Sequence, residues 1–291
     1  MFRGSIPALV TPFRDEAFDE ATFRAFVGWQ IDEGSHGLVP VGTTGESATL
    51  SAGEQRRVIA ACVEAAAGRV PVIAGCGSNS TASVIAHVKA ADEAGADAAL
   101  VVLPYYNRPN QEGILAHFRA IAAASRLPIV VYNVPSRTVT DVAVETLAKL
   151  AEMPNVVGIK DASGNPARVS AQRLACGAEF VQLSGNDDMT LALMAMGARG
   201  CISVTANVAP RLCADFQEAC LEGRWSDALA LQDRLYPLHA ALFSDASPGP
   251  VKYALSRVRP DFPPALRLPM TPPSEASRRA VDAALEHVGL V

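Results

Sequence analysis

The sequence Asn155-Val-Val-Gly-Ile-Lys160-Asp places a lysine at the end of a short apolar run. Pro154 precedes this run, and turn-forming residues follow it up to Asn165. An apolar run between such breakers predicts a strand buried on both faces, with Lys160 at its carboxyl end. Burial disfavours the charged form of an amine, so Lys160 is a candidate nucleophile for Schiff-base chemistry. The alternative is a covered stem whose ammonium group reaches solvent, and this stretch alone favours neither.

Lysine is scarce in the rest of the chain. The other three are Lys89, Lys149 and Lys252, although lysine and arginine together number 25. Lys89 and Lys149 lie on the polar sides of amphipathic helical patterns, and Lys252 follows Pro250 in a stretch that resembles a turn. None of these three ends an apolar strand, which favours a special role for Lys160.

Short β-branched runs alternate with longer helical patterns along the chain. Eight runs predict strands, at residues 5–10, 37–41, 71–74, 98–103, 128–132, 156–160, 180–183 and 200–204. Asp19 is a candidate N-cap for the first helix, and Ser51 with Glu54 forms a capping-box pattern before the second. Strands that are each followed by a helix predict an α/β fold, a parallel (β/α)8 TIM barrel. An open doubly wound sheet is disfavoured, since no G-x-G-x-x-G follows the first strand.

The last third of the chain is predicted to be mainly helical. A helix at residues 210–221 closes the barrel, and further helical patterns cover residues 225–243 and 275–288. Residues 259–273 between them contain six prolines, which predicts an extended strap. We therefore expect a barrel with the catalytic site over residues 1–224 and a C-terminal helical region packed on it over residues 225–291.

The composition disfavours several classes of protein. Apolar residues make up 49% of the chain and charged residues 19%, which is typical of a globular protein with a large core. A net charge of −5 without any basic run argues against a nucleic-acid partner. The six cysteines and five histidines lack metal-ligand spacing, so no metal site is expected. No signal peptide or membrane span is evident, and the cysteines fit a reducing, cytoplasmic location.

Polar residues follow several predicted strands, where a barrel carries its chemistry. Gly42-Thr43-Thr44-Gly45-Glu46 offers amides and hydroxyls for a small carboxylate, or is an ordinary turn that starts a helix. Tyr132 ends the strand next to that of Lys160 and could relay protons. Arg137 suits a second carboxylate, or is a solvated loop arginine. Gly185 would let the backbone approach a ligand closely.

Tyr105 and Tyr106 end the fourth predicted strand. Adjacent side chains must point in different directions, so one of the two could serve a subunit interface. Simple packing at the rim of the barrel is the alternative for either ring. No phosphate-binding loop follows the seventh and eighth strands, so a phosphorylated substrate is not indicated.

Five motifs together resemble the family of 4-hydroxy-tetrahydrodipicolinate synthases, also called dihydrodipicolinate synthases, in the superfamily of N-acetylneuraminate lyase and other class I pyruvate aldolases. These motifs are Gly42-Thr43-Thr44-Gly45-Glu46-Ser47, Pro104-Tyr105-Tyr106-Asn107, Tyr132-Asn133-Val134-Pro135-Ser136-Arg137, Gly158-Ile159-Lys160-Asp161 and Ser203-Val204-Thr205-Ala206-Asn207. The resemblance extends over nearly the whole chain. Each motif alone is weak, but their combination is specific.

The resemblance implies that the protein condenses pyruvate with L-aspartate 4-semialdehyde in lysine and diaminopimelate biosynthesis. Lys160 would form an imine with pyruvate, so that neither a metal nor an organic cofactor is required. Thr43 and Thr44 would hold the pyruvate carboxylate. Tyr132, Thr44 and Tyr106 would form a proton relay, with Tyr106 reaching in from a neighbouring subunit.

Further residues and the assembly are also implied by the resemblance. Arg137 would receive the semialdehyde carboxylate, and Gly185 and Ile202 would contribute backbone groups around the ligand. The family is most often a tetramer built as a dimer of dimers, which we expect here.

Two alternatives remain beside this assignment. N-acetylneuraminate lyases and 2-keto-3-deoxy sugar acid aldolases share the lysine, the tyrosine and the barrel, but Arg137 and Thr43 favour the dipicolinate branch. A non-catalytic pyruvate-binding or regulatory barrel would be expected to have lost Lys160 or Tyr132, and both are present.

Lysine-inhibited members of the family have an effector site at a subunit interface. The matching positions are Ser47, Ala48, Asn79 and Tyr105. Ala52, Gln55 and Ser83, however, stand where such members usually carry histidines and a glutamate. The ammonium group of an effector would lose a carboxylate partner, so weak or absent feedback by lysine is expected.

Overall fold

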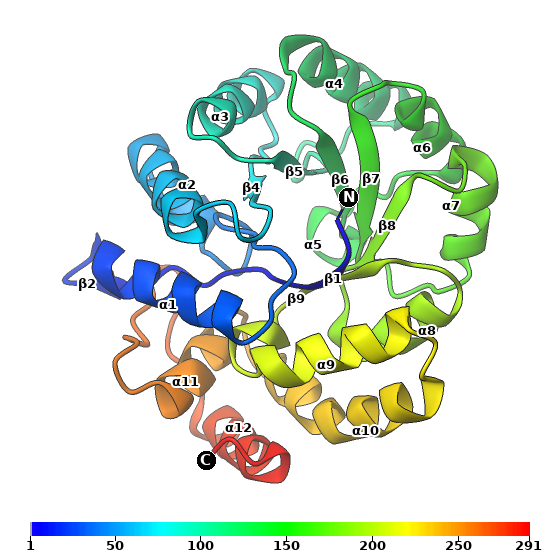
Figure 1. Cartoon of the computed structure of the whole chain (residues 1–291). Helices are drawn as coiled ribbons and strands as arrows, with labels where there is room; N and C mark the ends of the chain where they lie inside the picture. The colour runs from blue at the N-terminus through cyan, green and yellow to red at the C-terminus, as the bar shows by residue number, and fades with distance from the viewer. Residues whose placement is uncertain (1) are drawn as a thin grey trace.

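A curled parallel sheet forms the centre of the structure, a computed structural model that describes residues 2–291 (Figure 1). Its seven strands pair in the order β1-β9-β8-β7-β6-β5-β4. They are β1 (Gly4–Pro7), β4 (Ile73–Gly75), β5 (Ala98–Val102), β6 (Ile129–Asn133), β7 (Val156–Asp161), β8 (Val181–Ser184) and β9 (Gly200–Ser203). A short antiparallel pair, β2 (Phe13–Arg14) and β3 (Ala17–Phe18), follows β1.

Residues 37–41, predicted as the second strand, form only isolated parallel bridges. Val39 pairs with Ala8, and Leu38 pairs with Val72. Pro40 has no N–H to donate, and Val41 has a φ of 58°, so a regular strand cannot continue here. The prediction of a regular second strand was wrong, although the segment bridges to residues next to β1 and β4, the two end strands of the sheet.

Helices surround the sheet on its outer side (Figure 1). The helices from α1 to the one that follows β9 are α1 (Glu20–Asp32), α2 (Ala52–Ala66), α3 (Thr81–Glu93), α4 (Gln111–Ala124), α5 (Pro135–Thr138), α6 (Val144–Ala151), α7 (Arg168–Cys176), α8 (Thr190–Ala195) and α9 (Pro210–Leu221). The short 3-10 turns are η1 (Ser47–Thr49), η2 (Asp187–Met189) and η3 (Thr205–Asn207). Asp19 caps α1, and Ser51 with Glu54 forms the reciprocal capping box of α2, which confirms both predicted caps.

Three helices follow α9 and lie together at one side of the molecule (Figure 1). They are α10 (Trp225–Ala241), α11 (Gly249–Val258) and α12 (Glu275–Val288), and α12 contacts both α10 and α11. The sequence patterns did not predict α11, and the prediction of a turn at Lys252 was wrong. Pro250 lies in the first turn of α11, where its missing N–H costs nothing. Residues 259–273 contain no helix or strand, as expected of a strap.

Side chains of the strands alternate between two apolar clusters. Val131 and Ile159 belong to the large cluster shared with the helices, whereas Val130 and Tyr132 belong to a smaller cluster inside the curled sheet. This alternation turns Tyr132 and Lys160 toward the interior of the sheet. The residue after each of them is turned toward the helices.

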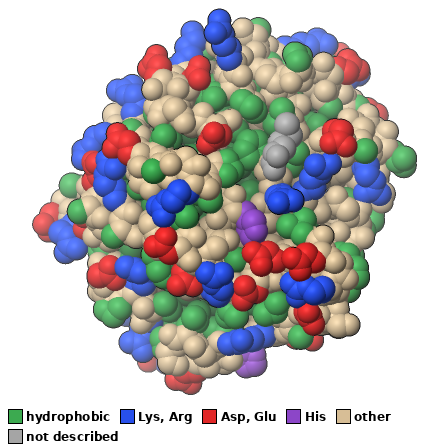
Figure 2. Space-filling view, viewed as in Figure 1, with side chains coloured by type: hydrophobic (Ala, Val, Ile, Leu, Met, Phe, Trp, Pro, Cys, Tyr) green, Lys and Arg blue, Asp and Glu red, His purple; other side chains and the backbone are tan. Residues whose placement is uncertain are grey.

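The outer surface carries both signs of charge. Lysine and arginine side chains are interspersed with aspartate and glutamate side chains on the face seen in Figure 2. No helix within residues 2–291 is sufficiently long and apolar to cross a membrane.

Candidate active site

Lys160 and Tyr132 are neighbours at the carboxyl ends of β7 and β6. The two strands pair with Tyr132 opposite Lys160. The Nζ atom of Lys160 lies 4.2 Å from the centroid of the Tyr132 ring, and Lys160 is only 6% exposed. Both side chains line a small cavity of about 40 Å³. A buried amine beside a phenol and an enclosed space is an arrangement suited to nucleophilic attack and proton transfer.

A larger cavity adjoins this small one. It has a volume of about 450 Å³, and Thr43, Ser47, Gly77 and Val102 line both spaces. Arg137 also lines the larger cavity. A ligand that reacts at Lys160 can therefore be flanked by a second molecule that extends toward a guanidinium group.

The predicted carboxylate loop has one exposed and one buried threonine. Thr43 is exposed and lines both cavities, whereas Thr44 is buried and lines neither of them. Gly45 and Glu46 end the motif, and Glu46 has a left-handed φ of 56°. Thr11 Oγ1 donates a 2.7 Å hydrogen bond to the carbonyl of Gly45, which anchors the loop to the segment after β1.

A buried ion pair between Lys252 and Glu46 stabilises this loop. Lys252 Nζ donates to Glu46 Oε1 at 2.7 Å and to the carbonyl of Thr11 at 2.8 Å. The second oxygen of Glu46 accepts the backbone N–H of Arg267 at 3.0 Å. Burial lowers the pKa of Lys252, while the charge of Glu46 opposes that shift. No sequence pattern predicted this pair, and the local signal for α11 is Pro250 near the helix start.

Gly185 and Ile202 lie close to Lys160 in different ways. A Cβ atom on Gly185 would stand 3.0 Å from Lys160 Cε and 2.7 Å from the Cβ of Ala162. Gly185 therefore makes room for the lysine side chain itself. Ile202 is buried on β9 within the inner apolar cluster that also contains Tyr132.

The two tyrosines after β5 are separated by the structure. Tyr105 lines the larger cavity, whereas Tyr106 is 91% exposed and lines neither cavity. Tyr106 has a φ of 71°, a backbone conformation that is costly for an aromatic residue. Within one chain the structure thus places Tyr132 beside Lys160, but it leaves Tyr106 on the surface.

Three of the four positions that match the lysine effector site of the family lie at the same cavity. Ser47, Ala48 and Tyr105 line the larger cavity, but Asn79 does not. The carbonyl of Asn79 accepts a 2.8 Å hydrogen bond from Asn107 Nδ2.

The three positions that depart from lysine-inhibited relatives lie on helices. Ala52 is exposed at the start of α2, and Ser83 lies in the first turn of α3. Gln55 lines the larger cavity, and its side-chain amide donates to the carbonyl of Ser47 at 3.1 Å. None of the three offers a carboxylate to a bound ammonium group.

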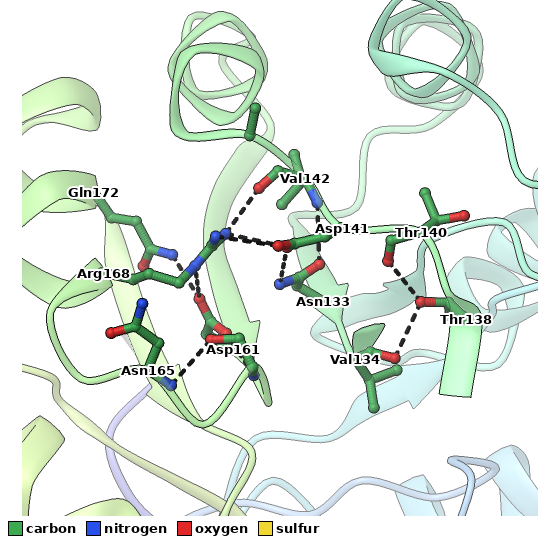
Figure 3. Close-up of polar contacts among 12 residues, drawn as sticks. Asn133, Val134, Thr138, Thr140, Asp141, Val142, Asp161, Asn165, Arg168 and Gln172 are labelled. Carbon is green, nitrogen blue, oxygen red and sulfur yellow. Dashed lines mark hydrogen bonds and ion pairs between the residues drawn. The ribbon is translucent and has the colours of Figure 1, made fainter. Parts of the chain in front are cut away.

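Asn133 and Asp161 follow Tyr132 and Lys160 and belong to a polar network on the helix side of the sheet (Figure 3). Arg168, which no sequence pattern had indicated as a site residue, donates to the Asp161 carboxylate in this network. No spacing signal would have identified it, because its partners lie in two separate segments, at Asp161 and at Asp141–Val142. Within residues 2–291 no group of three or more histidine, cysteine, aspartate or glutamate residues could hold a metal ion.

Comparisons with known proteins agree over the full length of the chain. A family model described as the Dihydrodipicolinate synthetase family matches residues 1–288. The chain is 71% identical over 290 residues to the 4-hydroxy-tetrahydrodipicolinate synthase of Rhizorhabdus wittichii, with 100% of both chains covered. A crystal structure of the chloride-inhibited dihydrodipicolinate synthase from Acinetobacter baumannii complexed with pyruvate has a TM-score of 0.97, with 42% identity over 100% of both chains. Another solved structure, described as a monomeric dihydrodipicolinate synthase variant, has a TM-score of 0.96 and 38% identity, and covers 100% of this chain and 98% of that chain.

Proposed function

Because this chain belongs to the dihydrodipicolinate synthetase family, we infer that it is a Schiff-base-forming lyase of the lysine and diaminopimelate pathway. It condenses pyruvate with L-aspartate 4-semialdehyde to 4-hydroxy-tetrahydrodipicolinate. One observation carries the assignment of the chemistry: the buried Lys160 amine lies against the Tyr132 ring and faces a cavity at the carboxyl ends of the strands.

We propose that Lys160 supplies the covalent step. Its neutral amine attacks the keto carbon of pyruvate, and the carbinolamine then takes up a proton and loses water, which leaves a protonated imine. In this proposal Tyr132 moves the protons of these two steps, with Thr44 and Tyr106 as its partners. Tyr106 comes from a neighbouring subunit, which its 91% exposure in the single chain supports. The imine is itself the electron sink, so the reaction uses no metal or organic cofactor.

The second half of the proposed reaction uses the adjoining cavity. Loss of a methyl proton converts the imine to an enamine, whose carbon adds to the aldehyde of the semialdehyde. The semialdehyde amine then attacks the imine carbon, closes the ring and releases Lys160. We propose that Thr43 and Thr44 hold the pyruvate carboxylate and that Arg137 binds the carboxylate of the semialdehyde. Gly185 and Ile202 complete the surroundings of the ligand.

Membership of the family also supports a proposal for the architecture and the assembly. We propose that residues 37–41 act as the missing strand of an eight-stranded barrel over residues 1–224, with residues 225–291 as a C-terminal helical extension. We further propose a tetramer of two dimers in the cytoplasm. A relative described as the first monomeric variant supports oligomers as the rule among these enzymes.

Borohydride trapping tests the proposed chemistry directly. The protein is incubated with pyruvate, reduced, and examined by intact mass and peptide mapping, with Lys160→Ala as the control. We expect a lactyl-type adduct on Lys160 and none on the variant. An active, folded protein without this adduct would contradict the Schiff-base mechanism. Assays with aspartate semialdehyde and with sugar-acid aldehydes then establish the second substrate.

A further inference from the structure

The last residues of β6 and β7 point away from the cavity. Asn133 follows Tyr132, Asp161 follows Lys160, and these two residues pair in register. Alternation along the strands turns their side chains to the helix side of the sheet. Contacts that hold Asn133 and Asp161 therefore also hold the strand ends that carry the reacting groups.

Three donors surround the Asp161 carboxylate. Arg168 Nε donates to Oδ2 at 3.0 Å, Gln172 Nε2 donates to the same oxygen at 2.6 Å, and the N–H of Ser163 donates to Oδ1 at 2.8 Å. Arg168 is the first residue of α7, and Gln172 lies one turn later on the same helix face. The carboxylate thereby joins the end of β7 to the first turn of α7.

Arg168 also bonds to the segment that follows β6. Its Nη2 donates to the carbonyl of Val142 at 2.8 Å, and its guanidinium lies 3.5 Å from the Asp141 carboxylate. Asp141 in turn accepts Asn133 Nδ2 at 2.9 Å, and Asn133 Oδ1 accepts the N–H of Val142 at 3.2 Å. One guanidinium group thus joins Asp161 on β7 to the residues that hold Asn133 on β6 (Figure 3).

Burial makes this link stronger than an ordinary surface ion pair. The side chains of Arg168 and Asp161 are 15% and 8% exposed, and the planar guanidinium can serve several acceptors in fixed directions. The link also extends to Gly185, because the carbonyl of Asp161 accepts the Gly185 N–H at 2.8 Å. A displaced Asp161 would therefore move the residue against which Lys160 Cε packs.

We propose that Arg168 is a positioning residue for the reaction, which holds β6 and β7 at the spacing that places Lys160 Nζ against the Tyr132 ring. Arg168 acts from the opposite face of the sheet and does not touch the substrate. This inference rests on the proposed function of Lys160.

The test compares Arg168→Ala and Arg168→Lys with Arg173→Ala as a matched control. Arg173 lies on the same helix and donates to the carbonyl of Met196, away from the strand ends. The readouts are the rate of pyruvate adduct formation on Lys160, kcat, and KM for pyruvate, all measured where circular dichroism shows folded protein. We expect R168A to form the adduct about 10- to 100-fold more slowly, because small displacements of reacting groups are costly in rate. KM should stay within about threefold, since the Thr43–Thr44 loop is untouched.

Rescue separates positioning from a merely structural role. Added guanidinium ion should restore part of the R168A rate, and R168K should be intermediate because an ammonium group lacks the planar fork. Adduct formation by folded R168A at the wild-type rate would overturn the proposal, as would an equal effect of R173A. If R168A does not fold, a wild-type rate in R168K overturns it instead. Absence of an adduct in the wild-type protein would overturn the Schiff-base function itself, and with it the positioning role.

Discussion

Lys252 and Glu46 lie 206 residues apart in the sequence and form an ion pair of 2.7 Å whose side chains are 0% and 2% exposed. Lys252 belongs to α11, and Glu46 ends the Gly-Thr-Thr-Gly-Glu loop. A fully buried ion pair therefore joins α11 to the loop of the candidate active site. Removing one charge would leave the other buried without its partner.

Replacing Lys252 should destabilise the protein strongly. Lys252→Met leaves the Glu46 carboxylate with only the backbone N–H of Arg267, at a cost of about 3–5 kcal/mol in unfolding free energy. The double variant Lys252→Met/Glu46→Gln should recover much of that loss, because no buried charge remains. Denaturant unfolding measures both. Arg279→Met, in the exposed pair with Glu275, is the control and should change stability by about 0.5 kcal/mol or less. Additive losses in the double variant would contradict the expected coupling.

Removing the hydroxyl of Tyr132 should affect catalysis more than folding. Tyr132→Phe keeps the ring that packs beside Lys160 but removes the phenol that we propose transfers protons, so kcat should fall by about 100-fold or more. The melting temperature should change little. Tyr253→Phe, which loses a bond to Asp282 between two C-terminal helices, serves as the control and should retain kcat. A wild-type kcat in Tyr132→Phe would show that the reaction does not need the phenol hydroxyl.

Adding one methyl group at Gly185 should slow imine formation. The new Cβ would lie 3.0 Å from Lys160 Cε and 2.7 Å from the Cβ of Ala162, so the lysine must move. We expect Gly185→Ala to reduce the rate of adduct trapping about tenfold or more. Gly28→Ala is the control, since nothing lies within 4 Å of its added Cβ. Equal trapping rates in the two variants would show that Lys160 tolerates the methyl group.

Part of the acid sensitivity should come from Glu54. Hydrogen bonding to Arg267 is the main reason why the pKa of Glu54 falls from 4.5 to about 2. A lowered folded-state pKa gives stability that is fully present above pH 4.5 and is lost as the pH falls toward 2, up to about 3 kcal/mol.

Unfolding of Glu54→Gln across this pH range checks that expectation. The stability difference from the wild type should be largest near neutral pH and should shrink between pH 4.5 and 2. Glu275→Gln, in the exposed pair with Arg279, should show almost no difference. A difference for Glu54→Gln that does not vary with pH would contradict the assignment.

Feedback by lysine should be weak or absent. Gln55 lines the larger cavity and uses its amide to bond to the carbonyl of Ser47, so it offers no carboxylate to an ammonium group. Titrating L-lysine into the condensation assay measures the effect. Half-inhibition at a submillimolar lysine concentration would show this expectation to be wrong.

Local sequence patterns determined the elements that carry the candidate nucleophile. A buried strand that ends in Lys160 and another that ends in Tyr132 were predicted from apolar runs and breakers, and both strands are present. The caps of α1 and α2 were predicted as well, because each cap joins residues only three positions apart. When such strands are parallel neighbours, their last residues lie side by side, so the fold class alone predicts that Tyr132 and Lys160 are close.

Only the tertiary structure decided which distant residues support the site. Glu46 meets Lys252 across 206 residues, and Arg168 joins Asp161 to the segment after β6. Bridged pairing replaces a regular strand at residues 37–41, where Pro40 removes a donor. The physical reason is that strands and caps depend on residues that are close together in the sequence. The partner of a buried charge, in contrast, depends on which distant segments pack beside it in the folded chain.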